Sequence, residues 1–386
     1  MTRVFVSAFC LLALLAPAAA DNVTFKVLYN FANDPDKASQ PSGDLVLDAS
    51  GNLYGVTSDS GGNIATVFEL SSDGAKTTLA TFPQVHNGAQ DPLAPLARDG
   101  EGNIFGAAAT GGPRCGRTGC GTIFKIAPDG TTTTLLALSR EKGMRPGNGL
   151  ILDGEGNLFG TVHHGRNIRS GAIFELSPDG QYTLLYALHS HKDGQYPIFG
   201  LITNGKGKFY GTTPYGGQIG GGTIFRYTPD GAFKVMHAFS STDGFFPQSP
   251  LTVDNDGNVY GAVSTTGPDL AGSIFRIAPD GTLTTLHIFN GQDGRYPDVS
   301  PVVDTNGDLY GITRQGGSSN DGVLYRLAQD GTFTVLHSFG GADGELPNGR
   351  LVSDGHGHLF GATTIGGGGS RCGQEGCGVI FEVDVQ

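Results

Sequence analysis

The sequence predicts an all-β fold, a seven-bladed β-propeller of four-stranded blades. Two observations predict it: a unit of about 50 residues recurs seven times, and the two ends of the chain share one unit between them. A repeat of this length that holds four short apolar runs is typical of a propeller blade, whereas solenoid coils repeat at shorter periods. No stretch places apolar residues at helical spacing over ten residues or more.

The repeat is marked by a glycine that follows a Leu-Tyr-like pair. Successive copies of this glycine lie 50 to 54 residues apart, which is close to one period throughout the chain. The marker glycines are Gly55, Gly106, Gly160, Gly211, Gly261, Gly311 and Gly361.

The four runs are clearest in the sixth copy, and we name them strands A to D in chain order. Strand A is 302–303, strand B is 309–312, strand C is 323–327 and strand D is 332–339. Asn, Asp and Gly separate strand A from B and strand C from D. Short apolar runs bounded by such residues are strands joined as hairpins.

The chain ends complete each other. The seventh copy stops after its C strand, 379–383, whereas residues 25–31 form an orphan D strand that closely matches 333–339. We therefore expect the N-terminal strand to complete the last blade and close the ring. Closure removes the sheet edges that an open array would expose.

The N-terminus reads as a targeting segment. Residues 1–20 have the features of a secretory signal peptide, with Arg3, an apolar run over 4–15 and small residues before Asp21. The apolar run is too short to span a bilayer. We expect residues 21–386 to form one propeller domain that is secreted or periplasmic, with no membrane insertion.

The charge balance limits the partners. The chain has 24 basic and 36 acidic residues, a net charge of −12, and no basic stripe in the sequence. This argues against nucleic acid and anionic membranes as partners. The sequence indicates no cofactor, and we expect a monomer.

Four cysteines follow the predicted signal peptide and form two matched pairs. Cys115 and Cys120 lie between strands B and C of the second copy, and Cys372 and Cys377 occupy the same place in the seventh. In an oxidising compartment such pairs form disulfides. A metal site is the alternative, but neither loop contains a histidine. We predict two local disulfides with a structural role.

The loops differ between the two faces of the predicted ring. The A–B and C–D turns are short and alike, and we call their side the turn face. The B–C loops vary in length and residue type, while the D–A crossings share Asp-Gly-x-x-Pro, as at 193–197 and 293–297. We call this side the loop face. Variable loops on a rigid scaffold carry function, so we expect the site on the loop face, at the mouth of the channel.

Four residues are candidates for catalysis: His163, His164, Tyr215 and Arg314. Other B strands run into Ser, Thr, Pro or Arg, whereas the third runs into the His pair. A His or Tyr base beside a cation suits removal of a proton next to a sugar carboxylate. The alternative is a polar loop with scattered solvated side chains.

Other polar residues have simpler explanations. His237, His287 and His337 share one D-strand position with Tyr29 and Tyr186, and we interpret them as packing or edge residues. The segment 254–258 resembles the start of a calcium loop but lacks the later bidentate Glu. We interpret it as a turn and predict no metal site.

The repeat resembles a known family. The segments GNLYGVT at 51–57 and GGTIFR at 221–226, with Asp-Gly-x-x-Pro, are similar to the GloVer tandem-repeat family of exported bacterial proteins. The resemblance covers nearly all of 23–384 and implies an extracellular location, but no defined activity or catalytic residues. Strand order is also similar to NHL-type propellers and the virginiamycin B lyase group, a likeness of architecture that does not fix function.

Two functions remain open. The leading hypothesis is a secreted, non-catalytic propeller that recognises a glycan or a protein on its loop face. The alternative is a polysaccharide lyase or hydrolase with a site near His163, His164 and Tyr215. The chain has no Trp, which weakens a lectin interpretation, although Tyr and Phe also stack on sugars.

Overall fold

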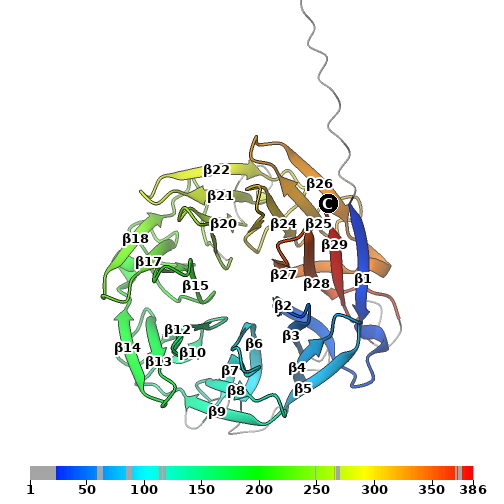
Figure 1. Cartoon of the computed structure of the whole chain (residues 1–386). Helices are drawn as coiled ribbons and strands as arrows, with labels where there is room; N and C mark the ends of the chain where they lie inside the picture. The colour runs from blue at the N-terminus through cyan, green and yellow to red at the C-terminus, as the bar shows by residue number, and fades with distance from the viewer. Residues whose placement is uncertain are drawn as a thin grey trace, which may run out of the picture.

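The computed structural model shows seven antiparallel sheets arranged as blades around a ring (Figure 1). It describes residues 23–58, 64–83, 89–112, 115, 119–247, 249–264, 266, 270–369, 372 and 376–385. The predicted seven-bladed propeller is confirmed. The predicted signal peptide lies outside the described residues.

Blades 1 to 3 occupy the first half of the chain. Blade 1 comprises β2 (Ser39–Leu47), β3 (Leu53–Ser58), β4 (Ile64–Leu70) and β5 (Lys76–Pro83). Blade 2 comprises β6 (Ala89–Arg98), β7 (Ile104–Gly111), β8 (Thr122–Ile126) and β9 (Thr132–Ala137). Blade 3 comprises β10 (Met144–Pro146), β11 (Ile151–Leu152), β12 (Leu158–His164), β13 (Ala172–Leu176) and β14 (Tyr182–Ala187).

Blades 4 to 7 repeat the arrangement. Blade 4 comprises β15 (Leu201–Thr203), β16 (Phe209–Thr213), β17 (Thr223–Tyr227) and β18 (Phe233–Ala238). Blade 5 comprises β19 (Thr252–Val253), β20 (Val259–Val263), β21 (Ser273–Ile277) and β22 (Leu283–Ile288). Blade 6 comprises β23 (Val302–Val303), β24 (Leu309–Thr313), β25 (Val323–Leu327) and β26 (Phe333–Ser338). Blade 7 comprises β27 (Glu345–Ser353), β28 (His358–Ile365), β29 (Val379–Asp384) and β1 (Thr24–Asn30).

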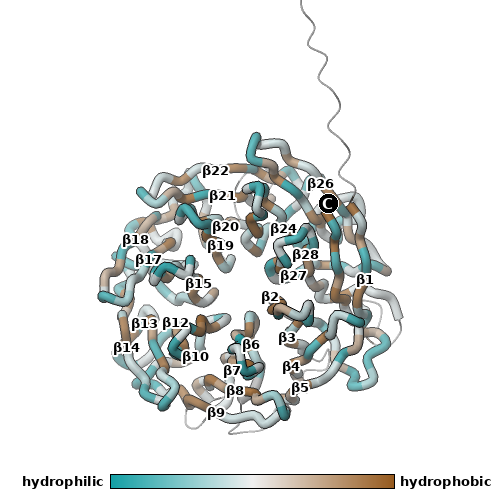
Figure 2. The backbone as a smooth tube through the Cα atoms, in the orientation of Figure 1, coloured by the Kyte–Doolittle hydropathy of each residue, from teal (hydrophilic) through white to brown (hydrophobic). Residues whose placement is uncertain are grey.

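Short helices lie in three D–A crossings: α1 (Ser190–Asp193), and the 3-10 turns η1 (Phe31–Asn33) and η3 (Gly341–Asp343). Hydrophobic and hydrophilic stretches alternate along the backbone of each blade (Figure 2). This alternation matches short buried strands joined by polar turns. None of the helices in the described part of the chain is long and apolar enough to cross a membrane.

The A strands are shortest in the middle of the chain. Those of blades 4 to 6 have only two or three residues, and that of blade 3 is divided into β10 and β11. The backbone between β10 and β11 bonds both to its own blade and toward the next, since the Gly147 N–H donates to the Thr161 carbonyl at 2.8 Å and the Asn148 N–H to the Ile198 carbonyl at 2.6 Å. The innermost chain therefore ties neighbouring blades together.

The ring is closed as predicted. Strand β1 pairs antiparallel with β29, with Phe25 opposite Val383 and Asn30 opposite Val379. Figure 1 shows the first and last strands of the chain, β1 and β29, lying side by side. The terminal blade thus acquires its fourth strand from the opposite end of the chain.

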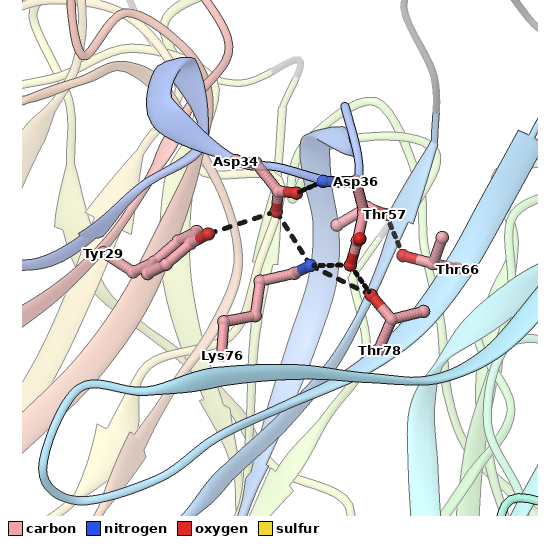
Figure 3. Close-up of polar contacts among 7 residues, drawn as sticks. All are labelled: Tyr29, Asp34, Asp36, Thr57, Thr66, Lys76 and Thr78. Atoms are coloured by element: carbon pink, nitrogen blue, oxygen red, sulfur yellow. Dashed lines mark hydrogen bonds and ion pairs between the residues drawn. The ribbon is translucent and has the colours of Figure 1, made fainter.

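Two polar ties cross the seam between blades 7 and 1. Figure 3 shows the first: Lys76 Nζ, from β5, lies 2.8 Å from an Asp34 oxygen and 3.3 Å from Asp36. The Lys76 and Asp34 side chains are 3% and 0% exposed, so loss of either partner would leave a buried charge. In the second, Arg350 of β27 donates to Asp44 at 2.9 Å and to the Leu251 carbonyl at 3.0 Å.

The marker glycines make room for aromatic rings. Each lies directly opposite the aromatic residue of its neighbouring C strand. A Cβ added at Gly211 would lie 2.4 Å from Phe225 Cζ, a distance that side chains do not tolerate. The pairs are Gly55–Phe68, Gly106–Phe124, Gly160–Phe174, Gly211–Phe225, Gly261–Phe275, Gly311–Tyr325 and Gly361–Phe381.

The D-strand histidines pack, as their shared position indicated. His287 Nε2 lies 3.1 Å from Asp293, and its ring stacks on Phe333 of the next blade at 3.8 Å. His237 and His337 pair with Asp243 and Asp343 in the same way. In these three crossings, the Asp of Asp-Gly-x-x-Pro therefore holds the histidine ring of the D strand before it.

The two predicted disulfides are present. Cys115 and Cys120 have Cα atoms 4.9 Å apart, and Cys372 and Cys377 have theirs 5.3 Å apart. Two disulfides are typical of a protein that works in an oxidising compartment.

Replacing a marker glycine tests the packing of the blades. We expect Gly211→Ala to lower the free energy of unfolding by about 1–3 kcal/mol, because the added methyl overpacks the Phe225 ring. Urea denaturation measures the effect. Gly154→Ala is the matched control, since its Cβ meets nothing within 4 Å, and should change stability by no more than about 0.5 kcal/mol. Equal stability of the two variants would contradict this packing.

Candidate functional site

Seven equivalent residues surround the loop face, one in each D–A crossing, and we call them the collar. Each precedes the proline of its crossing and has a positive φ, between 51° and 60°. This left-handed conformation is strained for a residue other than glycine. The collar consists of Gln40, Asp91, Arg145, Tyr196, Phe246, Tyr296 and Leu346.

Contacts between blades hold the collar backbone in place. The Tyr196 N–H donates to the Ser170 carbonyl of the preceding blade at 2.9 Å, and five other collar residues make the equivalent bond at 2.8–3.0 Å. The following proline packs on a glycine of that blade: a Cβ on Gly171 would lie 2.4 Å from Pro197 Cδ. These contacts offset the strain.

The disulfides support two collar residues directly. The Cys120 carbonyl accepts the Arg145 N–H at 2.8 Å, and the Cys377 carbonyl accepts the Gln40 N–H at 2.8 Å. Each cysteine loop therefore fixes the peptide that holds a collar residue. Because the backbone is the same in every crossing, the side chains are free to differ, and it is in the side chains that recognition can reside.

An aromatic row runs over blades 3 to 5 on the loop face. Ring centroids lie 6.3 Å apart for His164 and Tyr196, 6.2 Å for Tyr196 and Tyr215, and 5.4 Å for Tyr215 and Phe246. We call these four residues the aromatic row. Tyr196 and Tyr215 are 36% and 43% exposed, which is unusual for large aromatic side chains in a folded domain.

Backbone pairing explains the positions of two members of the row. His164 ends β12 and pairs with Met144 of β10, the residue before the collar position of blade 3. The Gln195 N–H donates to the Tyr215 carbonyl at 2.6 Å, which makes the same connection in blade 4. His164 and Tyr215 thus occupy equivalent places, each joined to a D–A crossing.

Two members of the row were not among the sequence candidates. Tyr196 and Phe246 come from the crossings, where Asp, Gly and Pro drew attention as the shared residues. A usable signal was present, since the residue before the proline is aromatic in three successive copies: Tyr196, Phe246 and Tyr296. Arg295 lies over the last of these rings, 5.0 Å from its centroid.

The histidine pair is neutral at physiological pH. Burial, the neighbouring His164 and Arg145 lower the pKa of His163 to about 4. Burial and Arg145 also lower the pKa of His164. A neutral imidazole can accept a hydrogen bond or a proton, so His163 is suited chemically to either binding or base catalysis.

Arg314 lies apart from the histidine pair. Its Nη1 atom is 4.0 Å from Asp298, which accepts a hydrogen bond from Ser264 at 2.8 Å. Burial raises the pKa of Asp298, while Ser264 and Arg314 oppose the shift. Across the described ranges, no hydrogen bond or ion pair joins any two of the four catalytic candidates. Asp298 is a further acidic group on this face that the sequence did not single out.

The turn face has cavities, and these lie at equivalent places between successive blades. Three cavities, of about 720, 760 and 660 Å³, lie between neighbouring blades and are lined mainly by A–B turns. In one of them Asp254 accepts bonds from the Asn258 N–H at 2.8 Å and the Tyr260 hydroxyl at 3.1 Å. This carboxylate closes its own turn, as the sequence indicated. We attribute these cavities to the wedge between adjacent blades.

No metal centre emerges from the described residues, since no group of three or more His, Cys, Asp or Glu among them is placed to hold an ion. The groups that the loop face does offer are stacking surfaces, neutral imidazoles and guanidinium groups. Such groups bind a ligand that has both flat apolar faces and polar edges.

Comparisons with known proteins agree with the repeat and the fold. A model of the Gloeobacter/Verrucomicrobia repeat matches residues 15–162, 65–267, 114–307 and 251–386. A comparison with curated protein sequences gives no significant match.

Among solved structures, the polysaccharide lyase Uly1 has a TM-score of 0.54 at 12% identity, with 90% of this chain and 91% of that chain covered. The PQQ-bound aldose sugar dehydrogenase from Streptomyces coelicolor has a TM-score of 0.50 at 14% identity, with 96% and 100% covered. A puromycin-hydrolyzing peptidase from Mycobacterium tuberculosis has a TM-score of 0.55 at 13% identity, with 88% and 52% covered. These similarities show the fold alone.

The low pKa of His163 predicts a pH dependence of stability. Unfolded, the imidazole has its ordinary pKa, so between pH 6.5 and about 4 the unfolded chain binds a proton that the folded chain does not. Stability should therefore fall as the pH drops through this window. We expect His163→Gln to reduce that loss by about 2–3 kcal/mol in urea denaturation. Titration of the His163 ring signal near its ordinary pKa in NMR spectra would contradict the assignment.

Proposed function

The chain belongs to the Gloeobacter/Verrucomicrobia repeat family, and we propose that it is a secreted, non-catalytic propeller that binds a glycan on its loop face. The single observation that carries this proposal is the aromatic row of His164, Tyr196, Tyr215 and Phe246. Sugar rings have apolar faces that stack on aromatic side chains and hydroxyl edges that need polar partners. The aromatic row supplies the stacking surfaces, and the surrounding loops supply the polar partners.

The backbone that carries the row is held by hydrogen bonds. The Tyr196 N–H donates to the Ser170 carbonyl, and the Tyr215 carbonyl accepts the Gln195 N–H. Aromatic side chains have few rotatable bonds and therefore lose little conformational entropy on binding. A strained backbone that several contacts maintain is a pattern found at binding sites.

The catalytic arrangement predicted around Arg314 is not formed. A lyase needs a base and a cation that converge on one sugar unit, within hydrogen-bond reach of the proton. Arg314 instead lies beside Asp298 in blade 6, and the histidine pair lies in blade 3. The lyase and the sugar dehydrogenase that share this fold act on carbohydrates, but at 12% and 14% identity they support the scaffold and not an activity.

Secretion is part of the proposal. Two disulfides support an oxidising location. The predicted signal peptide of residues 1–20 supports export.

Removal of the stacking rings tests the proposal. The wild-type protein is screened on a glycan array, and the affinity of the best ligand is then measured by calorimetry. We expect Tyr196→Ala and Tyr215→Ala each to weaken binding by about 3- to 10-fold, since each removes one stacking surface from a preformed row. Circular dichroism checks that both variants fold.

Leu184→Ala is the matched control. Leu184 is 45% exposed on β14, the outer strand of blade 3, and should leave the affinity unchanged. Absence of any glycan ligand, or full affinity in both tyrosine variants, would refute the proposed site. Unsaturated uronate absorbance during incubation with a polysaccharide would show a lyase instead.

A further inference from the structure

Exposed cations gather at the blade 3 end of the aromatic row. They come from the crossing before blade 3, from its B–C loop and from the crossing after it, all of which lie on the loop face. In the sequence they are spread over three loops, so they form no stripe there. The cations are Arg140, Lys142, Arg145, Arg166, Arg169 and Lys192, and we call them the basic cluster.

Nearby acidic groups neutralise only part of the basic cluster. None of its six members lies within 4.0 Å of a carboxylate oxygen in the described part of the chain. Lys142 lies over the Tyr182 ring of β14, 5.6 Å from its centroid. Asp193 is buried. Its carboxylate accepts a hydrogen bond from the Tyr186 hydroxyl at 2.9 Å and lies 3.1 Å from the His189 Nδ1 atom. Glu141 is the exposed carboxylate of the same loops, and hydrogen bonds from its own backbone and Ser139, with the charges of Arg166 and Arg140, lower its pKa. On a chain with a net charge of −12, this is a local excess of positive charge.

The basic cluster and the aromatic row meet at Arg145. This residue occupies the collar position of blade 3, where the Cys120 carbonyl holds its N–H and Pro146 packs on Gly121. Its neighbour Met144 pairs with His164, the first member of the row. The Arg166 N–H donates to the Arg140 carbonyl at 2.6 Å, which joins the two cationic loops. A ligand stacked on the row therefore ends against guanidinium groups.

We propose that the glycan bound by the row is acidic: its uronate carboxylates pair with Arg145 and Arg166 while its sugar rings stack on Tyr196 and Tyr215. This inference rests on the proposed function and names its ligand class. A guanidinium binds a carboxylate through two parallel hydrogen bonds, which gives direction as well as charge. An extended nucleic acid is a poorer fit, because beyond the basic cluster it would meet a negatively charged protein.

Matched acidic and neutral glycans test the inference. Calorimetry at low salt measures binding of galacturonate, mannuronate and glucuronate oligosaccharides, each beside its methyl ester. At least one acid should bind about tenfold or more tightly than its ester, since charge-assisted hydrogen bonds are lost on esterification. Arg145→Gln with Arg166→Gln should abolish this preference, and added salt should reduce it.

The control removes equal charge from the turn face. Lys206→Gln with Lys208→Gln alters an exposed A–B turn of blade 4 and should keep the preference. Equal binding of acids and esters overturns this inference but leaves glycan binding intact. No binding of either form overturns both. Tighter binding of a single-stranded oligonucleotide than of any acidic glycan also overturns the inference.

Discussion

The antiparallel pairing of β1 with β29 joins the two ends of the chain, and the closed ring of seven blades depends on that join. In the closed ring blades 7 and 1 also pack on each other, so that every blade has two neighbours. Without β1, blade 7 would expose the edge of β29, and the segment that carries Asp34 to its buried pair with Lys76 would no longer be anchored by a strand. Ring closure therefore completes the last blade and its interface with blade 1.

Within the closed ring, one structural device both builds the fold and presents the site. Six of the seven crossings show a collar hydrogen bond to the preceding blade, and in all seven the residue before the proline has a left-handed conformation. The backbone contacts that impose this conformation are the same around the ring, whereas the side chain is not involved in them. The collar can therefore carry Arg145 in one blade and Tyr196 in the next without altering the scaffold, which is how a regular repeat acquires an asymmetric surface.

Much of the fold was predictable from the sequence because the repeat states it seven times. Marker glycines, hairpin turns, cysteine pairs and the matching end strands each have one physical explanation. The site was less predictable. His164 and Tyr215 stood out by residue type, but Tyr196 did not, because a residue before proline ordinarily avoids helical backbone conformations and its left-handed form arises only from contact with another blade. The basic cluster was only partly evident from the sequence for a similar reason, since folding brings its loops together.

Ring closure can be tested most directly by comparing thermal unfolding of residues 21–386 with that of a chain that begins at Ala32 and so lacks β1. The truncated chain should melt at a markedly lower temperature or fail to fold, and a peptide of residues 23–31 added in trans should restore the melting temperature in a concentration-dependent way. An unchanged melting temperature in the truncated chain, with no response to the peptide, would contradict the account.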